Sequence, residues 1–375
     1  MVEVEQIDTS IKKQVHRFVE VPFRLYKDTP QWVPPIRIDV ETTLNRKKHP
    51  FYEHSQADFF IARKDNEDVG RIAVLVNNHY NEYHHTQRAQ FYFYECMDDQ
   101  EAANALFERA FKWARQRGLT EIIGPKGFAV LDGYGMLVDG FEHRQMMTMM
   151  NYNHAYNVTQ VENLGFEKEV DFLSCYVETA KFKVPERVKS IAERVQQRGT
   201  LRVLRFKNKK ELIGWADRIG KTYNEAFVNN WEYVPLTPRE IDFTVDNLMT
   251  VANPKLIKII AHDDDAVGFL FGFPDVSAAL QRNKGRLLPF GIFDLLIELR
   301  RSEWIAVNGA GILPEFQGRG GNALMYSEME DTASQFHFKY AEMTQVAESA
   351  VDMRRDLISL GGIPYKNHRV YRRAL

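Results

Sequence analysis

Residues 314–324, Pro-Glu-Phe-Gln-Gly-Arg-Gly-Gly-Asn-Ala-Leu, place three glycines, an arginine and an amide between two patterned stretches. The preceding run, 304–313, has the alternation of a strand, and apolar residues recur at helical spacing in 322–338. A glycine-rich turn from a strand into a helix directs free N–H groups and the positive end of the helix dipole at one point. We therefore predict that this segment binds an anion such as a pyrophosphate, with Arg319 adding positive charge.

Length and composition bound the remaining possibilities. The chain has 375 residues, of which 44% are hydrophobic and 12% aromatic, enough for two globular domains. Its 49 basic and 51 acidic residues leave a net charge of −2, which does not favour a nucleic-acid partner. Two cysteines, no signal-peptide pattern and no run of 18 apolar residues lead us to expect a cytoplasmic protein without a membrane partner. The oligomeric state is not indicated.

The two halves repeat the same order of features. Hairpin patterns occur at 59–74 and 258–270, and each half later carries an Asn-Ala-Leu triplet and a Leu-Gly pair. Each match is short and could be coincidence, but their shared order favours duplication of one α/β domain. We predict domains at 1–180 and 200–375, joined by a charged linker at 181–199 in which Pro185 can begin a helix.

Each half is expected to run from a strand through helices, a hairpin, a strand, a helix, a short strand and a helix to a terminal strand. The main predicted ranges are 2–7, 89–94, 100–117, 121–123 and 170–177 in the first half, and 201–206, 304–313, 321–338, 340–344 and 368–373 in the second.

This order, with a Gln-x-x-Gly loop after the fourth strand, resembles the GNAT acyltransferase family. Its Gln/Arg-x-x-Gly-x-Gly/Ala motif is matched by residues 317–322 except at the last position, where Asn322 replaces Gly or Ala. The resemblance implies an α/β (α+β) fold of two tandem GNAT-like domains, each a mixed, mostly antiparallel sheet flanked by helices. It also implies acetyl-CoA or another acyl-CoA as cofactor. The implied cofactor-binding residues are Ile312 and Leu313 at the strand end, and Gln317, Gly318, Arg319, Gly320, Gly321 and Asn322 in the loop.

The first half lacks this loop. Aligning Asn104 with Asn322 sets residues 99–103 against 317–321 and puts Asp99 and Glu101 where Gln317 and Arg319 stand. Asp99 can cap the following helix and Glu101 can complement its dipole, so this helix start should repel phosphate. We predict a degenerate N-terminal domain that serves as scaffold or contributes to the substrate side.

The catalytic groups are less clearly marked. The tyrosine that many family members carry in the last helix corresponds here to Leu357, and to Val161 in the first half. Tyr365 or Tyr371 could protonate the leaving thiolate instead, or be strand residues with solvated hydroxyls. Glu303 at the start of the fourth strand is a candidate base, and the alternatives are a solvated surface charge there and a water held by Asn308.

Two insertions could determine acceptor specificity. The loop 124–137 and the following segment are rich in glycine, methionine and aromatic residues, and could contact substrate or form a small satellite core. The candidate substrate contacts are Tyr134, Asn151, Tyr152 and Tyr156. The second insertion, 277–301, contains the apolar run 287–293, which could cover a groove between the halves or pack on the other half or a second subunit.

No metal site is expected, because His79, His84 and His85 lack the spacing of a closed ligand set. The resemblance therefore implies transfer of an acyl group, acetyl in the first instance, from acyl-CoA to a small-molecule or peptide amine. Two alternatives stay open: a CoA- or metabolite-binding protein without catalysis, and an aminoacyl or long-chain acyltransferase of tandem GNAT type.

Overall fold

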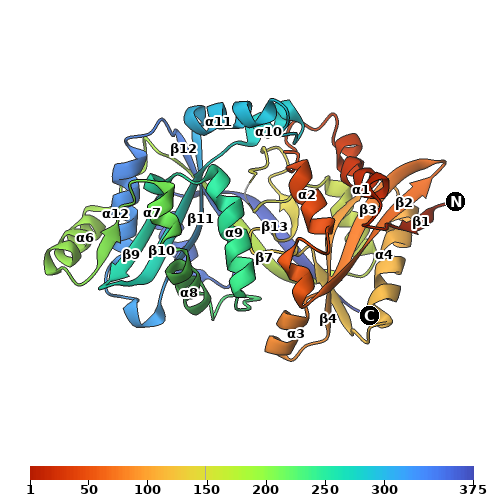
Figure 1. Cartoon of the computed structure of the whole chain (residues 1–375), viewed down its shortest axis with the longest axis horizontal. Coiled ribbons are helices and arrows are strands. Elements are labelled where there is room, and N and C mark those ends of the chain that lie inside the picture. Colours follow the sequence, from red (N-terminus) through yellow and green to blue (C-terminus); the bar gives the residue numbers. More distant parts are fainter. Residues whose placement is uncertain (148) are drawn as a thin grey trace. The chain divides into compact units, whose positions relative to one another are not determined.

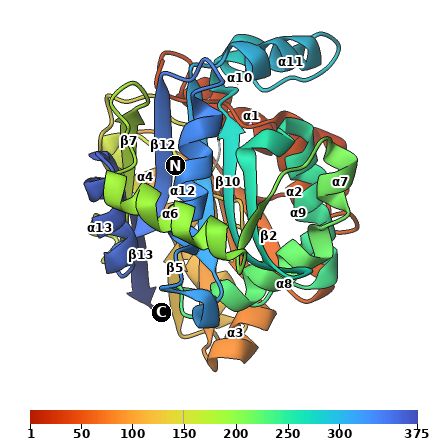
Figure 2. The ribbon, with the colours of Figure 1, turned by 90° about the vertical axis from the view of Figure 1, so that its left-hand side faces the viewer.

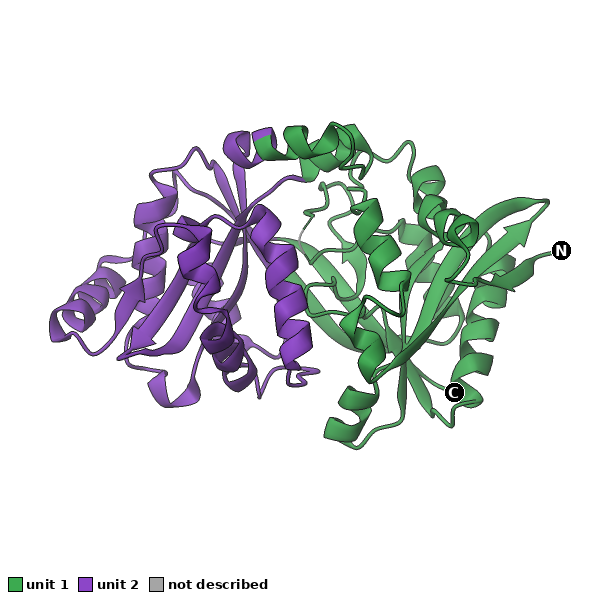
Figure 3. Cartoon of the chain, viewed as in Figure 1, with its two compact units in different colours: residues 1–173, 277–296, 365–375 green, residues 174–276, 297–364 purple. Residues whose placement is uncertain are grey.

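The computed structural model describes residues 1–147 and 149–375, which form two compact units (Figure 3). Unit 1 comprises residues 1–173, 277–296 and 365–375, and unit 2 comprises residues 174–276 and 297–364. The units are groups of residues in mutual contact and are discontinuous in sequence, so they do not test the predicted domain bounds at 180 and 200, which stay a prediction.

Unit 1 is built on a mixed sheet in the order β1-β2-β3-β4-β5-β13-β7, with β6 paired to β13. Strand β4 pairs with β5 in parallel, whereas the pairs β1–β2, β2–β3, β3–β4, β5–β13 and β6–β13 are antiparallel. The strands are β1 (Glu3–Gln6), β2 (Gln56–Lys64), β3 (Glu67–Val76), β4 (Arg88–Cys96), β5 (Glu121–Gly124), β6 (Met136–Asp139), β7 (Glu167–Glu178) and β13 (Ile363–Ala374). The predicted hairpin at 59–74 is confirmed as β2 and β3.

The helices of unit 1 pack on its sheet through two clusters of buried apolar side chains. One contains Phe107 and Phe111 of α4 packed on Phe91 and Phe166, and the other contains Phe18 of α1 in edge contact with Phe59. The helices are α1 (Lys12–Leu25), α2 (Arg37–Leu44), the 3-10 turn η1 (Pro50–Glu53), α3 (Asn78–His84), α4 (Gln100–Arg115), α5 (Ala155–Asn163) and α10 (Ser277–Asn283), labelled where visible in Figure 1.

Unit 2 repeats the plan with the strand order β7-β12-β11-β10-β9-β8. Its strands are β8 (Arg202–Leu204), β9 (Ile257–His262), β10 (Asp265–Pro274), β11 (Trp304–Ile312) and β12 (Tyr340–Ala347), together with the end of β7. Hairpin β9–β10 confirms the second predicted hairpin, and β11 and β12 are parallel as β4 and β5 are. The repeated topology gives both halves the same mixed, mostly antiparallel architecture.

The helices of unit 2 include one that the linker was expected to form. Helix α6 (Glu186–Arg198) begins directly after Pro185 and packs across α12 (Gly321–Ala333), as Figure 2 shows. The others are α7 (Lys209–Ile213), α8 (Ala216–Ala226), α9 (Pro238–Val251), the 3-10 turns η2 (Pro254–Leu256) and η3 (Pro314–Phe316), and α13 (Val351–Ser359). Helix α11 (Gly291–Arg301) begins in unit 1 and ends in unit 2.

The terminal strands differ from the expectation that each half completes its own sheet. Residues 365–374 of β13 belong to unit 1, where Tyr371 pairs with Gly124 of β5. The end of β7 belongs to unit 2, where the Ser174 hydroxyl accepts a bond from Gln345 N at 3.1 Å. The alternation of a strand predicts its faces but not its neighbour, which is why this exchange was missed. Among the described residues, no helix combines the length and apolar character needed to span a bilayer.

Candidate active site

The predicted anion loop connects β11 to α12 in unit 2. Gly318 and Gly320 have φ values of 71° and 88°, a region that costs side-chain-bearing residues energy. The Gln317 amide donates to Ile312 O at 3.1 Å and so ties the loop to the strand end. Arg319 is exposed, with its guanidinium carbon 5.2 Å from the centre of the Phe316 ring. These contacts give the loop a defined shape with a solvent-facing cation.

The N-terminus of α12 is electrostatically open. Gly320 is its N-cap residue, no side chain caps the helix, and its fully described first turn holds no acidic residue. The first N–H groups of a helix have no partners within the helix, and their partial positive charge attracts anions. This helix start can therefore accept phosphate oxygens from outside the protein.

The other side of the loop is closed by α6. A Cβ atom on Gly320 would lie 2.6 Å from Val195 Cγ2 and 3.0 Å from Ile191 Cγ2. A Cβ on Gly318 would meet nothing within 4 Å. Glycine at 320 is thus required by close packing as well as by its φ angle, and an anion must approach from the open side at Gly318. The spacing of Val188, Ile191, Ala192 and Val195 is the sequence signal for this packing face.

The corresponding helix start in unit 1 is satisfied internally, as predicted. Asp99 Oδ1 caps α4 by accepting from Glu101 N at 2.9 Å and Ala102 N at 3.2 Å. Lys64 Nζ lies 2.6 Å from Asp99 Oδ2 and 3.3 Å from Glu101 Oε2. The hydrogen bond from Lys64 lowers the pKa of Asp99 from its usual value. The two equivalent helices therefore differ: α4 begins at two paired carboxylates and α12 begins at glycines.

Strand β11 carries an irregularity close to the loop. Leu270 pairs with Ala310 but Gly272 pairs with Val307, so Asn308 and Gly309 form a bulge, and Gly309 has a φ of 80°. The Asn308 side chain is buried, and its Nδ2 has no hydrogen-bond partner among the described residues. A buried amide without an acceptor is costly, which marks this point as a place where a ligand oxygen would be stabilised.

The three catalytic candidates do not gather in one unit. Glu303 belongs to unit 2, where its half-exposed carboxylate pairs with Lys339 Nζ at 2.5 Å. Tyr365 and Tyr371 belong to unit 1. Tyr371 is 1% exposed, its hydroxyl donates to Glu162 Oε1 at 2.8 Å, and burial is the main cause that raises its pKa above the usual value. Tyr365 accepts a bond from Lys366 Nζ at 3.0 Å. These roles stay predictions, and the buried, bonded hydroxyl speaks for a structural part for Tyr371.

Of the four predicted acceptor contacts, all in unit 1, Asn151 has a clear structural part. Its side-chain Nδ2 donates to Gly133 O and Gly135 O at 3.0 and 2.9 Å. Its backbone carbonyl oxygen lies 3.0 Å from His368 Nε2. Burial lowers the pKa of His368 to about 4, so this imidazole is neutral at pH 7. Asn151 therefore stabilises the loop 124–137 through hydrogen bonds to its backbone.

The three tyrosines among these contacts are half-buried and lie in aromatic packing. Tyr134 stacks on Phe172 at 5.2 Å between centroids, and Tyr156 on His154 at 5.0 Å. The Tyr152 hydroxyl donates to Phe141 O at 3.1 Å. Burial raises the pKa of Tyr156 to about 12, so its hydroxyl stays protonated. These contacts fit the satellite core that was the alternative reading, and acceptor binding by these residues stays a prediction.

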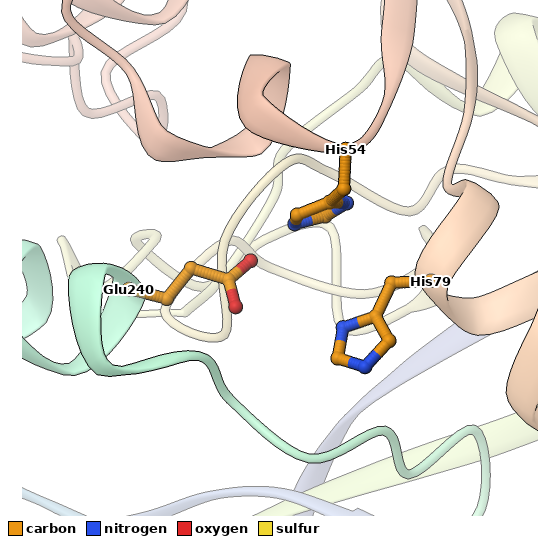
Figure 4. Close-up of side chains that lie close together, drawn as sticks. All are labelled: His54, His79 and Glu240. Carbon is orange, nitrogen blue, oxygen red and sulfur yellow. The ribbon is translucent and has the colours of Figure 1, made fainter.

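The histidines do not form a ligand set within one unit. His54 and His79 belong to unit 1 with ring centroids 5.4 Å apart, whereas Glu240, also drawn in Figure 4, belongs to unit 2. His84 and His85 were expected to be surface residues, and His84 packs against Tyr80 at 4.4 Å. No metal is assigned to these residues.

Solved structures match this architecture along the whole chain. A tandem GNAT protein from the clavulanic acid biosynthesis pathway, solved without AcCoA, is 12% identical with a TM-score of 0.57, covering 100% of this chain and 98% of that one. The chain has the tandem GNAT fold. A GCN5-related N-acetyltransferase from Sphaerobacter thermophilus also matches, with 11% identity, a TM-score of 0.51 and coverage of 100% and 95%.

Two curated proteins are similar to this tandem GNAT chain over nearly their full lengths. Bacterial ceramide synthase of Caulobacter vibrioides is 28% identical over 382 aligned positions, covering 100% of this chain and 98% of that protein. Protein YghO of Escherichia coli is 26% identical over 370, covering 97% and 94%. No protein-family model matches the chain.

Proposed function

We propose that this protein is an acyl-CoA-dependent N-acyltransferase that holds the CoA pyrophosphate at the loop 317–322 of unit 2. The observation that carries the proposal is the difference between the two helix starts. Helix α12 begins with glycines, without a cap, and beside an exposed Arg319, whereas α4 begins at Asp99, which is capped onto its own helix and paired with Lys64. An anion is attracted to the first and repelled by the second. On this proposal, unit 2 binds the CoA pyrophosphate and unit 1 does not.

The acyl group is the second part of the proposal. The expected donor from sequence was acetyl-CoA, with a long-chain acyl-CoA as an alternative. Similarity over the whole length to a bacterial ceramide synthase favours the long-chain donor. A ceramide is a long-chain amino alcohol acylated on its nitrogen, so the corresponding acceptor class is an amphiphilic amine.

In this proposal, the acceptor nitrogen attacks the thioester carbonyl, the C–S bond breaks, and the thiolate leaves and takes up a proton. Asn308 Nδ2, buried and unpaired among the described residues, is the candidate donor to the carbonyl oxygen as negative charge develops there. Glu303 is ion-paired with Lys339 and half-exposed, so we favour loss of the amine proton through water over loss to Glu303.

A thiol-release assay tests this function. Acetyl-, octanoyl- and palmitoyl-CoA are each offered with soluble amines and with a sphingoid base, and free CoA is detected with a thiol reagent. Amine-dependent release that is fastest with the longer donors is expected. Release fastest with acetyl-CoA would return the donor to the shorter class. CoA binding without release from any pair would refute the enzyme and support the binding-protein alternative.

Replacing the buried amide tests the proposed donor. Asn308→Ala should lower the turnover number about 100-fold while CoA affinity stays the same, since the amide would act on the reacting oxygen only. Asn229→Ala, at an exposed position after α8 and outside the proposed CoA-binding loop, is the control and should leave the turnover number within about threefold. Equal turnover in both variants would contradict the role of Asn308.

A further inference from the structure

An apolar patch stands exposed on unit 1. It consists of Leu288, Phe290, Phe293 and Leu296, which are 76%, 75%, 62% and 48% exposed. They lie in the turn after α10 and in the first part of α11, both labelled in Figure 2. A group of large apolar side chains exposed together often marks a surface that binds another protein or a membrane. The sequence predicts that the run 287–293 covers a groove between the halves, or packs on the other half or a second subunit, and leaves these alternatives open.

The patch is presented on a fixed base. The Gln281 amide of α10 donates to Pro30 O at 2.8 Å and Trp32 O at 2.9 Å, and Arg37 N donates to Gly285 O at 3.0 Å. These bonds fasten α10 and its following turn to the segment 30–37 of unit 1. The base of the patch is therefore not free to swing away from the domain.

The inner face of α11 is occupied as well. Leu295 is buried, and Asp294 accepts two bonds from Arg282, at 2.8 and 3.0 Å, and one from Asn283 at 2.7 Å. Rolling the helix to bury Phe293 and Leu296 would break these bonds and expose Leu295. The apolar side chains of the patch therefore stay outward.

Within residues 277–301, most of the charged residues that border the patch are basic. Lys284 and Arg286 are exposed in the turn that precedes it, and Arg300 and Arg301 follow in the last turn of α11. Residues 277–301 contain only two acidic residues, Asp294 and Glu298, and Asp294 is paired with Arg282. Exposed phenylalanines bordered by lysine and arginine match an anionic lipid surface, into which rings insert while cations meet headgroups.

We propose that this patch docks the protein onto anionic bilayers, so that it takes an amphiphilic substrate from the membrane surface. The inference rests on the proposed function for the substrate, and on the patch itself for the docking. A second copy of the chain is a poorer occupant, because a twofold contact through the patch would bring together two surfaces that are both bordered by basic residues.

Vesicle co-sedimentation of the full chain, without substrate, tests the docking. Wild type should bind vesicles of phosphatidylcholine with added phosphatidylglycerol, bind phosphatidylcholine alone more weakly, and dissociate with salt. Phe290→Ser with Phe293→Ser should weaken binding about tenfold or more, and Lys284→Gln with Arg286→Gln about fivefold per residue. The control is Ile213→Ser with Ile358→Ser, which removes side chains 48% and 50% exposed elsewhere and should leave binding unchanged.

Three results would overturn the inference: no binding of wild type to either vesicle, equal binding by the phenylalanine variant, or light scattering that shows a dimer which that variant dissociates. Thiol release measured in parallel with octanoyl-CoA and a soluble amine separates the two proposals. Turnover without vesicle binding would refute only the docking. Vesicle binding without turnover on any substrate pair would refute the proposed function and leave the docking standing.

Discussion

Alanine at Gly320 and at Gly318 should have different effects, although both residues have left-handed backbone angles in the same loop. Each substitution places a Cβ at a φ of 88° or 71°, which costs about 1 kcal/mol of folding free energy. At 320 the new methyl also lies 2.6 Å from Val195 Cγ2, and such overpacking costs about 1–3 kcal/mol more. At 318 no atom lies within 4 Å.

We therefore expect Gly320→Ala to lower the free energy of unfolding by about 1–3 kcal/mol more than Gly318→Ala. Urea denaturation followed by circular dichroism measures both. Adding Val195→Ala to Gly320→Ala should recover part of the difference, because Val195→Ala removes the methyl group that the new Cβ overlaps, so the two changes are not additive. Equal stabilities of the two single variants, or strict additivity with Val195→Ala, would refute the packing of α6 against the loop.

Three further predictions concern buried and capping groups. Asp99→Ala should lower the free energy of unfolding by about 1 kcal/mol through loss of the helix cap. Because the pKa of Asp99 is lowered in the folded protein, the stability that its carboxylate contributes should be lost as the pH falls through the acidic range. An unchanged urea midpoint of the variant at pH 7 would contradict the capping role. Burial raises the pKa of Cys96 to about 12 and of Cys175 to about 11, so neither thiol of the native protein should react rapidly with a disulfide reagent at pH 8, and rapid labelling before denaturation would show otherwise. Burial lowers the pKa of His368 from 6.5 to about 4 in the folded protein, so the unfolded chain binds more protons between these two pH values. The free energy of unfolding should therefore fall by on the order of 3 kcal/mol as the pH drops from 6.5 to 4. His368→Asn should flatten that fall, and an equal slope in the variant would disprove the assignment.

Local patterns predicted much of the fold. The hairpins, the helix start at Asp99 and the linking helix after Pro185 each depend on a few neighbouring residues with a strong preference, and the structure confirms them. The turn from β11 into α12 was predicted for the same reason, since glycine and arginine after a strand are a local signal, and anion binding there stays a prediction.

What was missed depends on distant contacts. That residues 365–374 join unit 1 is decided by their pairing with β5 and β6, far away in sequence. The packing of Val195 near Gly320 likewise arises when separate elements meet, as does the burial of Asn308 Nδ2 without a partner in the described part of the chain. Tyr371 was a reasonable catalytic candidate by its position after the Leu-Gly turn, but only the structure shows its hydroxyl bonded to Glu162.

Calorimetric titration of CoA into the wild-type protein and a charge-reversal pair tests the central claim most directly. Arg319→Glu changes the exposed cation at the α12 loop, and Arg115→Glu changes an exposed arginine at the end of α4 that lies over a phenylalanine ring in a similar way. If the pyrophosphate is bound at the start of α12, Arg319→Glu should weaken CoA binding about tenfold or more and Arg115→Glu should leave it unchanged. Equal affinity of Arg319→Glu and wild type for CoA would contradict the account.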